Sequence, residues 1–275
     1  MKKPKMSAPK AIGLIAGNRR FPVVFAQEAK QRGVRVVAVG IKGETDPHVA
    51  RLVDKLIWLS LKEFDKIVGI FKNEGITSVV MAGQISPVKL FSREVKESPF
   101  IQELLARMKD KKANTIFGTI AERLASVGIT LESSTMFLDD YLPQKGVLTA
   151  TQPTEEEWED IRFGLGLAKK VADLDIGLAV GVKNKAIVAV EAFEGTDNLI
   201  RRAGWLARKG VVIVKVGRTG QDMRFDIPVI GLATVKTLAR ANASCLAFEA
   251  GTTLMLDRQQ AIQLADRKKI SLVAV

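Results

Sequence analysis

We predict an α/β protein with two domains, and three features of the sequence support this fold class. Apolar runs typical of buried strands alternate with helix patterns along most of the chain, as in parallel sheets covered on both faces. The alternation stops at residues 133–151, where apolar residues are scattered around Pro143 and Gly146. The length of 275 residues also exceeds the usual size of a single core. We therefore expect a first domain at 1–132, a linker at 133–151 and a second domain at 152–275.

Five strand patterns separated by helices predict a Rossmann-like parallel sheet in the first domain. Strands are expected at 11–17, 34–40, 52–59, 77–83 and 129–132. Helices are expected at 23–32, from the capping box Ser60–Glu63 to Asn73, from Ser98–Pro99 onward, and at 117–127. The first of these helices has Pro22 in its first turn and Gly33 after its end, where each residue is favoured.

The second domain is predicted to be a distinct α/β unit. Thr154 and Glu157 form a capping box, which predicts a helix up to Leu174. A hairpin is expected around Lys183–Lys185, with strands at 178–182 and 186–193. Further helices are expected at 196–209, 234–241 and 258–268, and further strands at 211–216, 246–248, 253–256 and 270–275.

The composition limits the kinds of site that the chain can form. Cys245 and His48 are the only cysteine and the only histidine, so an intramolecular disulfide is impossible and a Cys/His metal cluster is disfavoured. A metal would be a hard ion held by oxygen ligands. No apolar run is long enough to span a bilayer. These features fit a cytoplasmic protein, and the net charge of +12 is expected to attract phosphorylated ligands, anionic lipids or nucleic acids.

Two turns in the first domain are candidate substrate-binding segments. Gly17 and Asn18 follow the first strand, and Gly83 and Gln84 follow the fourth. Because ligands bind outside the carboxyl ends of parallel strands, we expect these turns to lie on one edge and to form a crevice. The G-x-G-x-x-G dinucleotide fingerprint is absent. A tight turn that requires glycine explains the first segment equally well, and a surface turn set by Pro87 explains the second equally well.

Two acidic segments in the second half are candidates for the chemistry. Glu194-Gly195-Thr196-Asp197 stands at a predicted helix start, where amides can bind an anion and Asp197 can hold a cation or complement the helix dipole. The segment from Gln221 to Asp226 places two carboxylates around Arg224, a pattern that suits a divalent ion and a phosphate together. A surface salt-bridge cluster is the structural alternative.

Lys215 interrupts an otherwise apolar strand pattern at 211–216. A lysine buried in such a strand needs an anionic partner.

At these residues the sequence resembles the LpxI-type UDP-2,3-diacylglucosamine pyrophosphatases of bacterial lipid A synthesis. The resemblance covers nearly the whole chain. It is carried by GLIAGN at 13–18, FP at 21–22, MAGQISP at 81–87, GVLT at 146–149, QPT at 152–154, DIG at 175–177, AVEAFEGTD at 189–197, QDMRFDIPVIG at 221–231 and FEAGTTLMLD at 248–257.

The resemblance implies hydrolysis of UDP-2,3-diacylglucosamine to 2,3-diacylglucosamine 1-phosphate (lipid X) and UMP, with dependence on magnesium. Magnesium bound by one or two carboxylates and the substrate phosphates would neutralise the diphosphate charge for in-line attack by water. The expected metal ligands are Asp222, Asp197 and Asp226, and the expected catalytic residues are Asp222, Asp226 and Lys215. Substrate binding is expected from Gly17, Asn18, Gly83, Gln84, Glu194, Gly195, Thr196, Gln221 and Arg224.

A diacylated substrate also implies transient contact with the inner membrane, which the basic head MKKPK could assist. We expect a cytoplasmic protein peripheral to that membrane, and a homodimer is possible. Two other functional classes fit the sequence less well. A nucleotide-sugar transferase or oxidoreductase is disfavoured because the dinucleotide fingerprint is missing. A nucleic-acid-binding protein is disfavoured because the cations are dispersed and aromatic residues make up 6% of the chain.

Overall fold

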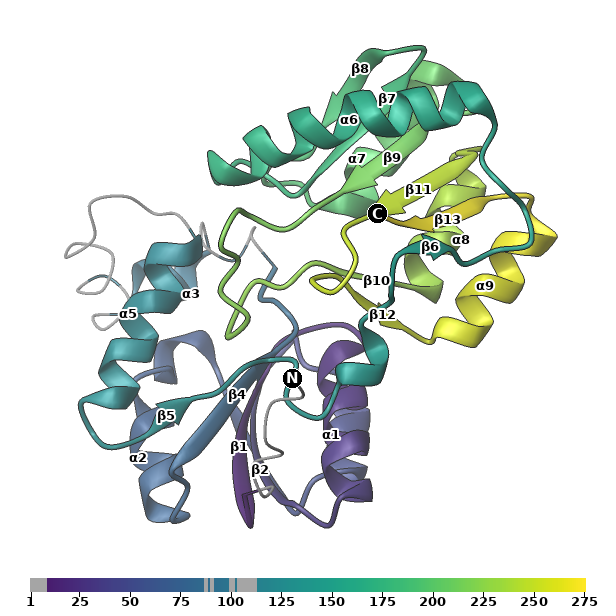
Figure 1. Ribbon diagram of the computed structural model, residues 1–275. Helices are drawn as coiled ribbons and strands as arrows, with labels where there is room; N and C mark the ends of the chain where they lie inside the picture. The colour runs from purple at the N-terminus through teal and green to yellow at the C-terminus, as the bar shows by residue number, and fades with distance from the viewer. Residues whose placement is uncertain (1–8, 87–88, 90–91, 99–101, 103–112) are drawn as a thin grey trace. The chain divides into compact units, whose positions relative to one another are not determined.

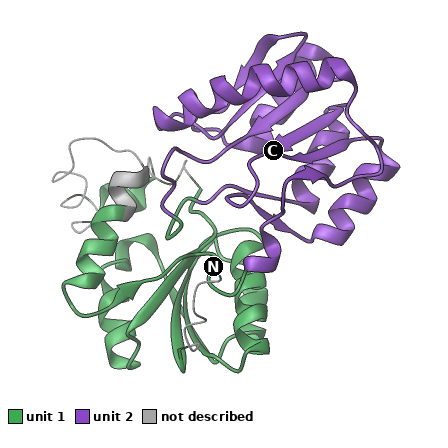
Figure 2. Cartoon of the chain, in the orientation of Figure 1, with its two compact units in different colours: residues 1–138, 223–226 green, residues 139–222, 227–275 purple. Residues whose placement is uncertain are grey.

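The computed structural model describes residues 9–86, 89, 92–98, 102 and 113–275 (Figure 1). The basic head and nearly all of the helix predicted from Ser98–Pro99 lie outside these residues. The chain forms two compact units, shown in Figure 2. Unit 1 comprises Met1–Leu138 together with Met223–Asp226, and unit 2 comprises Asp139–Asp222 and Ile227–Val275. The predicted linker at 133–151 thus contributes residues to both units.

Unit 1 contains the predicted Rossmann-like parallel sheet. Its strand order is β3 (Lys55–Leu59), β2 (Arg35–Ile41), β1 (Ala11–Ala16), β4 (Ser78–Ala82) and β5 (Thr130–Leu131), with all neighbours parallel. The helices among its described residues are α1 (Phe21–Gln31), α2 (Lys66–Asn73), α3 (Arg93–Lys96) and α5 (Ala113–Ala125), with short 3₁₀ turns at Pro47–Arg51 and Leu61–Glu63. Apolar side chains of the strands and helices form its core.

The capping box at Ser60–Glu63 forms, but it caps a different element from the one predicted. Glu63 Oε2 accepts the amide of Ser60 at 3.1 Å, as a capping box requires. The turn that follows is 3₁₀, and α2 begins only at Lys66. A capping box satisfies the first amides of a helix and does not determine whether an α-helix or a 3₁₀ turn follows.

Unit 2 contains a mixed six-stranded sheet. Its order is β6 (Gly146–Val147), β13 (Ser271–Ala274), β11 (Cys245–Phe248), β9 (Val212–Lys215), β7 (Ala179–Lys183) and β8 (Ala186–Val190). The central strands β13, β11 and β9 are parallel, whereas β7 is antiparallel to both of its neighbours. The predicted hairpin is confirmed as β7–β8. A separate parallel pair joins β10 (Val229–Gly231), which was not predicted, to β12 (Leu254–Leu256).

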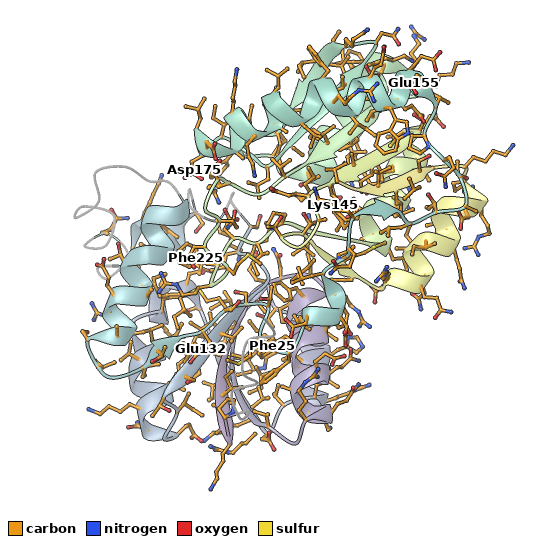
Figure 3. All side chains as sticks on the ribbon, viewed as in Figure 1. Phe25, Glu132, Lys145, Glu155, Asp175 and Phe225 are labelled. Atoms are coloured by element: carbon orange, nitrogen blue, oxygen red, sulfur yellow. The ribbon has the colours of Figure 1, made fainter. Side chains whose placement is uncertain are left out.

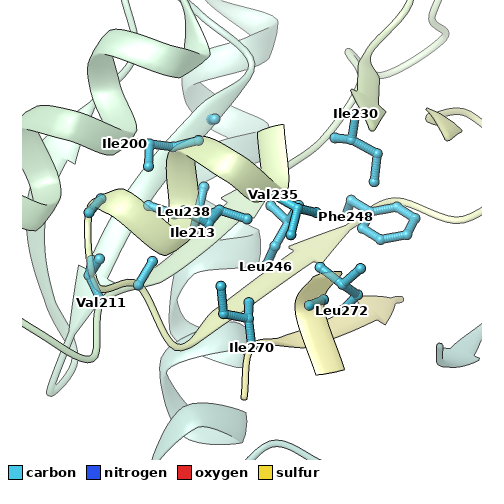
Figure 4. Close-up of a cluster of buried hydrophobic side chains, with 14 of the residues drawn as sticks. Ile200, Val211, Ile213, Ile230, Val235, Leu238, Leu246, Phe248, Ile270 and Leu272 are labelled. Carbon is cyan, nitrogen blue, oxygen red and sulfur yellow. The ribbon is translucent and has the colours of Figure 1, made fainter. Parts of the chain in front are cut away.

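Helices cover both faces of this sheet. The long α6 (Glu155–Asp173) packs on one face through Ile161, Ala168 and Ala172. On the other face lie α7 (Thr196–Ala207), α8 (Leu232–Arg240) and α9 (Arg258–Arg267), which share a buried cluster with strand residues such as Ile213 and Leu246 (Figure 4). Within the described part of the chain, no helix combines the length and the apolar character that crossing a bilayer requires.

Candidate active site

The strands β8, β9 and β11 of unit 2 end on the same edge of the sheet, which we call the carboxyl edge. Lys215 at the end of β9 pairs with Phe248 at the end of β11 and with Ala179 at the start of β7. The loops that follow these strand ends carry residues 191–197, 216–222 and 249–253. The structure therefore brings the EGTD segment, Lys215 and Gln221–Asp222 to one edge, where open sheets bind ligands.

A chain of polar groups, buried at both of its ends, links two of the predicted residues at this edge. The Lys215 ammonium donates to Thr196 Oγ1 at 2.7 Å, and the Thr196 hydroxyl donates to Glu191 Oε1 at 2.8 Å. Glu191 Oε2 accepts the amide of Leu178 at 3.1 Å. Lys215 is only 5% exposed and Glu191 only 6%. The expected anionic partner of Lys215 is therefore Glu191, acting through one threonine hydroxyl.

Glu191 is missing from the predicted site residues, although a signal for it exists. It is a carboxylate placed directly after the apolar β8, only five residues before Thr196. A charged residue at the buried end of a strand needs a polar partner, and the partner in this case is the start of the next helix. Spacing alone does not reveal which side chain of that helix start the carboxylate contacts.

The other residues of the EGTD segment are held by protein contacts. Glu194 accepts the amide of Ala192 at 3.1 Å and an Arg202 N–H at 2.5 Å. Burial raises the pKa of Glu194, but the hydrogen bonds from Arg202 and the backbone outweigh it, so the net pKa is lowered and the group stays anionic. Gly195 caps α7 with a φ of 79°, and Asp197 accepts from the Thr237 hydroxyl at 3.4 Å. These contacts fix the first turn of α7.

Glu249, the residue that follows β11, is one of the groups that hold the loop after β9. Glu249 Oε2 accepts the amide of Gly217 at 2.8 Å, and Lys169 of α6 binds Glu249 Oε1 at 2.9 Å. The Lys169 ammonium also donates to the carbonyl of Gly217 at 2.9 Å. The residue after β11 and a lysine of α6 thus hold Gly217 near the start of the loop.

Two aspartates near the end of α6 hold the rest of this loop. Arg218 forms a nearly buried ion pair with Asp175 (labelled in Figure 3). Asp173 accepts the amide and the hydroxyl of Thr219 at 2.7 and 2.8 Å, and these bonds lower its pKa. Gln221 Oε1 accepts the amide of Arg218 at 3.1 Å. The loop therefore presents Gln221 and the following Asp222 from a rigid frame.

The segment from Gln221 to Asp226 is divided between the two units. Gln221 and Asp222 belong to unit 2, whereas Met223–Asp226 belongs to unit 1. Phe225 is 5% exposed and lies in the main core cluster of unit 1. Ser134 donates to the carbonyl of Arg224 at 2.6 Å, and its amide donates to the carbonyl of Met223 at 2.7 Å. The sequence places the whole segment in the predicted second domain. Nothing in the residues next to Phe225 along the chain indicates that its side chain packs in the core of unit 1.

The two glycine turns of unit 1 lie together, as the parallel sheet predicts. The amide of Gly17 donates to Ala82 O at 2.8 Å, and that of Asn18 to Gln84 O at 2.7 Å. A Cβ on Gly17 would lie 2.6 Å from Gln84 O, and one on Gly83, at φ 82°, would lie 2.5 Å from Asn18 O. The close approach of the two backbones explains both glycines. Substrate contacts by these four residues stay a prediction.

The fit of a metal ion depends on how many protein ligands it needs. Among the described residues, no three His, Cys, Asp or Glu side chains are grouped as a preformed metal site. Magnesium commonly takes only one or two carboxylates and completes its shell with water and substrate phosphates. Asp222 offers a carboxylate of this kind on the rigid loop after β9. Cys245 is buried, and burial raises the pKa of its thiol, so it is unsuited to bind a metal.

Unit 2 also has a hollow of about 390 Å³, and the residues that line it lie outside the loops described above. Asp139, Asp140, Lys145 and Arg258 contribute charged groups to its lining. Its lining includes none of the site residues predicted from the sequence.

Comparisons with known proteins agree with this division into two α/β units. Residues 11–141 match the model of the LpxI N-terminal domain, and residues 144–273 match that of the LpxI C-terminal domain. The chain is 29% identical over 265 residues to a UDP-2,3-diacylglucosamine pyrophosphatase LpxI from Caulobacter vibrioides. The similarity covers 93% of this chain and 94% of that protein.

Proposed function

Because this chain belongs to the LpxI family, we propose that it hydrolyses the pyrophosphate link of UDP-2,3-diacylglucosamine in lipid A biosynthesis. The products would be 2,3-diacylglucosamine 1-phosphate and UMP. The observation that best supports this chemistry is the hydrogen-bonded chain Lys215–Thr196–Glu191 at the carboxyl edge, in which Lys215 and Glu191 are buried. It places one cation, held by a neighbouring carboxylate, beside the loop that carries Asp222.

Lys215 suits the role of a phosphate-binding cation. An ammonium group has three N–H donors, and within the described part of the chain the hydrogen bond that we find for it goes to Thr196. The other donors can bind phosphate oxygens. In a site of low dielectric, such a cation stabilises developing negative charge far better than it would in water. The Thr196 hydroxyl and Glu191 fix the position of the ammonium before the substrate binds.

We assign Asp222 the central role among the carboxylates. When bound with the diphosphate, magnesium would neutralise the phosphate charge and polarise the attacked phosphorus. Asp222 would hold the ion, with Asp197 and Asp226 as further candidate ligands. Asp222 can alternatively orient the attacking water as a general base. Arg224 and Gln221 are proposed to bind the substrate. A lipid substrate also requires transient contact with the membrane that carries it.

The test is to incubate the purified chain with UDP-2,3-diacylglucosamine and magnesium and to identify the products by mass. We expect UMP and the diacylated sugar phosphate, and we expect a chelator to stop their release. Asp222→Asn should lower kcat by about a hundredfold or more, whereas Asp65→Asn, an exposed position in unit 1, should not change it. Products other than UMP and the diacylated sugar phosphate would refute the proposed reaction. Full activity in the presence of chelator would refute the proposed dependence on a metal ion.

A further inference from the structure

The opposite edge of the same sheet, where β9, β11 and β13 begin, has a different character. We call it the amino edge. The helices α7, α8 and α9 all end there, because each leads into one of these strands. The amide of Gly210 after α7 donates to Asn242 O after α8 at 2.8 Å, and the amide of Ser271 donates to Ser244 O at 2.9 Å. These contacts join the ends of the helices into one surface.

Large apolar side chains protrude at this edge. Trp205 in the last turn of α7 is 79% exposed, and the adjacent Leu206 is 50% exposed. On the buried side of the same turn, a Cβ added to Gly204 would lie 2.4 Å from the carbonyl of Ala241. The helix is therefore seated closely on α8, while its widest side chain faces away from the protein. A tryptophan at such a position is unusual unless something covers it.

Cations surround these two apolar residues. Arg201 and Arg202 lie one turn earlier on the exposed face of α7, where Arg202 pairs with Glu194. Arg208 and Lys209 lie just beyond Leu206. The neighbouring helix and strand junctions add further basic residues to the amino edge, most of them exposed: Lys183, Lys185, Arg240, Arg267, Lys268 and Lys269. Lys183 donates to the carbonyls of Ala207 and Lys209 and thereby adds its charge to the end of α7.

Acidic residues are scarce on this surface. Neither 198–216 nor 229–248 contains a single aspartate or glutamate. Asp266 of α9 accepts the amides of Ala150 and Thr151, and Glu159 pairs with Lys185. The acidic start of α6 belongs to the other face of the sheet. The face formed by α7, α8 and α9 is thus cationic where Trp205 and Leu206 protrude.

We propose that this surface, centred on Trp205 and Leu206 at the amino edge of unit 2, docks on an anionic lipid bilayer. Tryptophan and leucine enter the headgroup and upper acyl region, and arginine and lysine around them bind anionic headgroups. A protein partner is disfavoured because protein–protein interfaces are depleted of lysine, whereas Lys209, Lys268 and Lys269 are exposed on this surface. The docking does not depend on the hydrolysis proposed above, and it can be measured without substrate.

The decisive measurement is co-sedimentation of the full chain with substrate-free vesicles. One set contains phosphatidylcholine alone, and the other contains phosphatidylcholine with phosphatidylglycerol. We expect binding to the anionic vesicles only, weakened by salt because exposed charges are screened. Arg208→Glu with Lys209→Glu should weaken binding about tenfold or more, since each basic residue near such a surface contributes substantially. Lys30→Glu with Lys72→Glu, which makes the same charge change at exposed positions of unit 1, should bind as the unmodified chain does.

The depth of Trp205 gives an independent readout. With Trp58→Phe and Trp158→Phe, Trp205 is the sole tryptophan. Its emission should shift to shorter wavelength on anionic vesicles, and acrylamide should quench it less. Trp205→Ala should reduce binding, whereas Leu174→Ala, at an exposed leucine at the end of α6, should not. The proposal would be overturned if the emission is unchanged, if the chain binds neutral vesicles equally well, or if Arg208→Glu with Lys209→Glu has no effect on binding. The proposal would also be overturned if the chain self-associates, if Trp205→Ala abolishes this self-association, and if the chain does not bind vesicles.

Discussion

The two edges of the unit 2 sheet use charge in opposite ways. At the carboxyl edge, cations are buried or half-buried against carboxylates of the same unit, as in Lys169–Glu249, Arg218–Asp175 and the chain from Lys215 to Glu191. At the amino edge, arginines and lysines stand exposed at the ends of three helices. One edge therefore has groups with fixed positions, and the other has a diffuse positive field.

This difference follows from the topology. Loops that leave the carboxyl ends of parallel strands lie side by side, so their side chains can bind one another across the edge. Helix ends at the amino edge attract cations through the helix dipole, without a need for specific partners. Fixed geometry suits bond cleavage, which depends on groups held in place. A diffuse field suits attraction to a charged surface. The predictions below test this contrast, from the largest expected effect to the smallest.

The largest effect is expected from the Arg218–Asp175 pair. Asp175→Asn keeps a residue that tolerates the left-handed backbone observed there, at φ 58°, but removes the negative charge. Because the pair is nearly buried, removing the carboxylate that Arg218 binds should lower the free energy of unfolding by about 3 kcal/mol. Urea unfolding measures this change. A loss below about 0.5 kcal/mol, the range of exposed pairs, would show that the two edges do not differ in this way.

Removing the buried ammonium should affect the reaction strongly. Lys215→Met retains much of the apolar stem, and we expect kcat for the proposed hydrolysis to fall by about a hundredfold to a thousandfold, as when other preorganised donors are removed. Lys183→Met is the matched control, because Lys183 lies on the adjacent β7 at the amino edge. Steady-state kinetics on both variants, with folding checked by circular dichroism, tests the assignment. Equal losses in the two variants would contradict it.

The sequence predicts much of this fold, because strand and helix periods are local properties. The parallel sheet of unit 1, the β7–β8 hairpin and the helices α6, α7 and α9 were all predicted close to their observed bounds. The common location of Gly17 and Gly83 followed from the rule for parallel strands.

What escaped prediction depends on contacts between distant residues. The partners of the loop after β9, Lys169 and Glu249, lie 48 and 32 residues from Gly217. The insertion of Phe225 into unit 1 is equally non-local, since Ser134 and Arg224 are 90 residues apart. No spacing rule reveals such pairs. β10 was missed because three residues after Pro228 are too few to show a strand period.

A smaller effect on the reaction is expected from Glu191, which acts through Thr196. Glu191→Gln keeps the shape of the side chain but removes the charge that holds the threonine hydroxyl. We expect kcat to fall by about tenfold with little change in KM, because Lys215 stays present but is less firmly positioned. Thr196→Ser retains the hydroxyl and should be close to full activity, whereas Thr196→Val should resemble Glu191→Gln. A Thr196→Val variant with normal kcat would remove the positioning role.

The smallest effect is expected where an ion pair is exposed. Glu159 of α6 pairs with Lys185 near the amino edge at 2.9 Å, and the hydrogen bond from Lys185 lowers the pKa of Glu159. A lowered folded-state pKa contributes stability that is present above the unfolded value and lost as pH falls through the folded value. Both side chains are well exposed, so solvent screens the pair. Glu159→Gln should therefore leave the urea midpoint unchanged at pH 7 and at pH 3. A clear drop in the urea midpoint at pH 7 that disappears at pH 3 would show that the amino edge also depends on specific ion pairs.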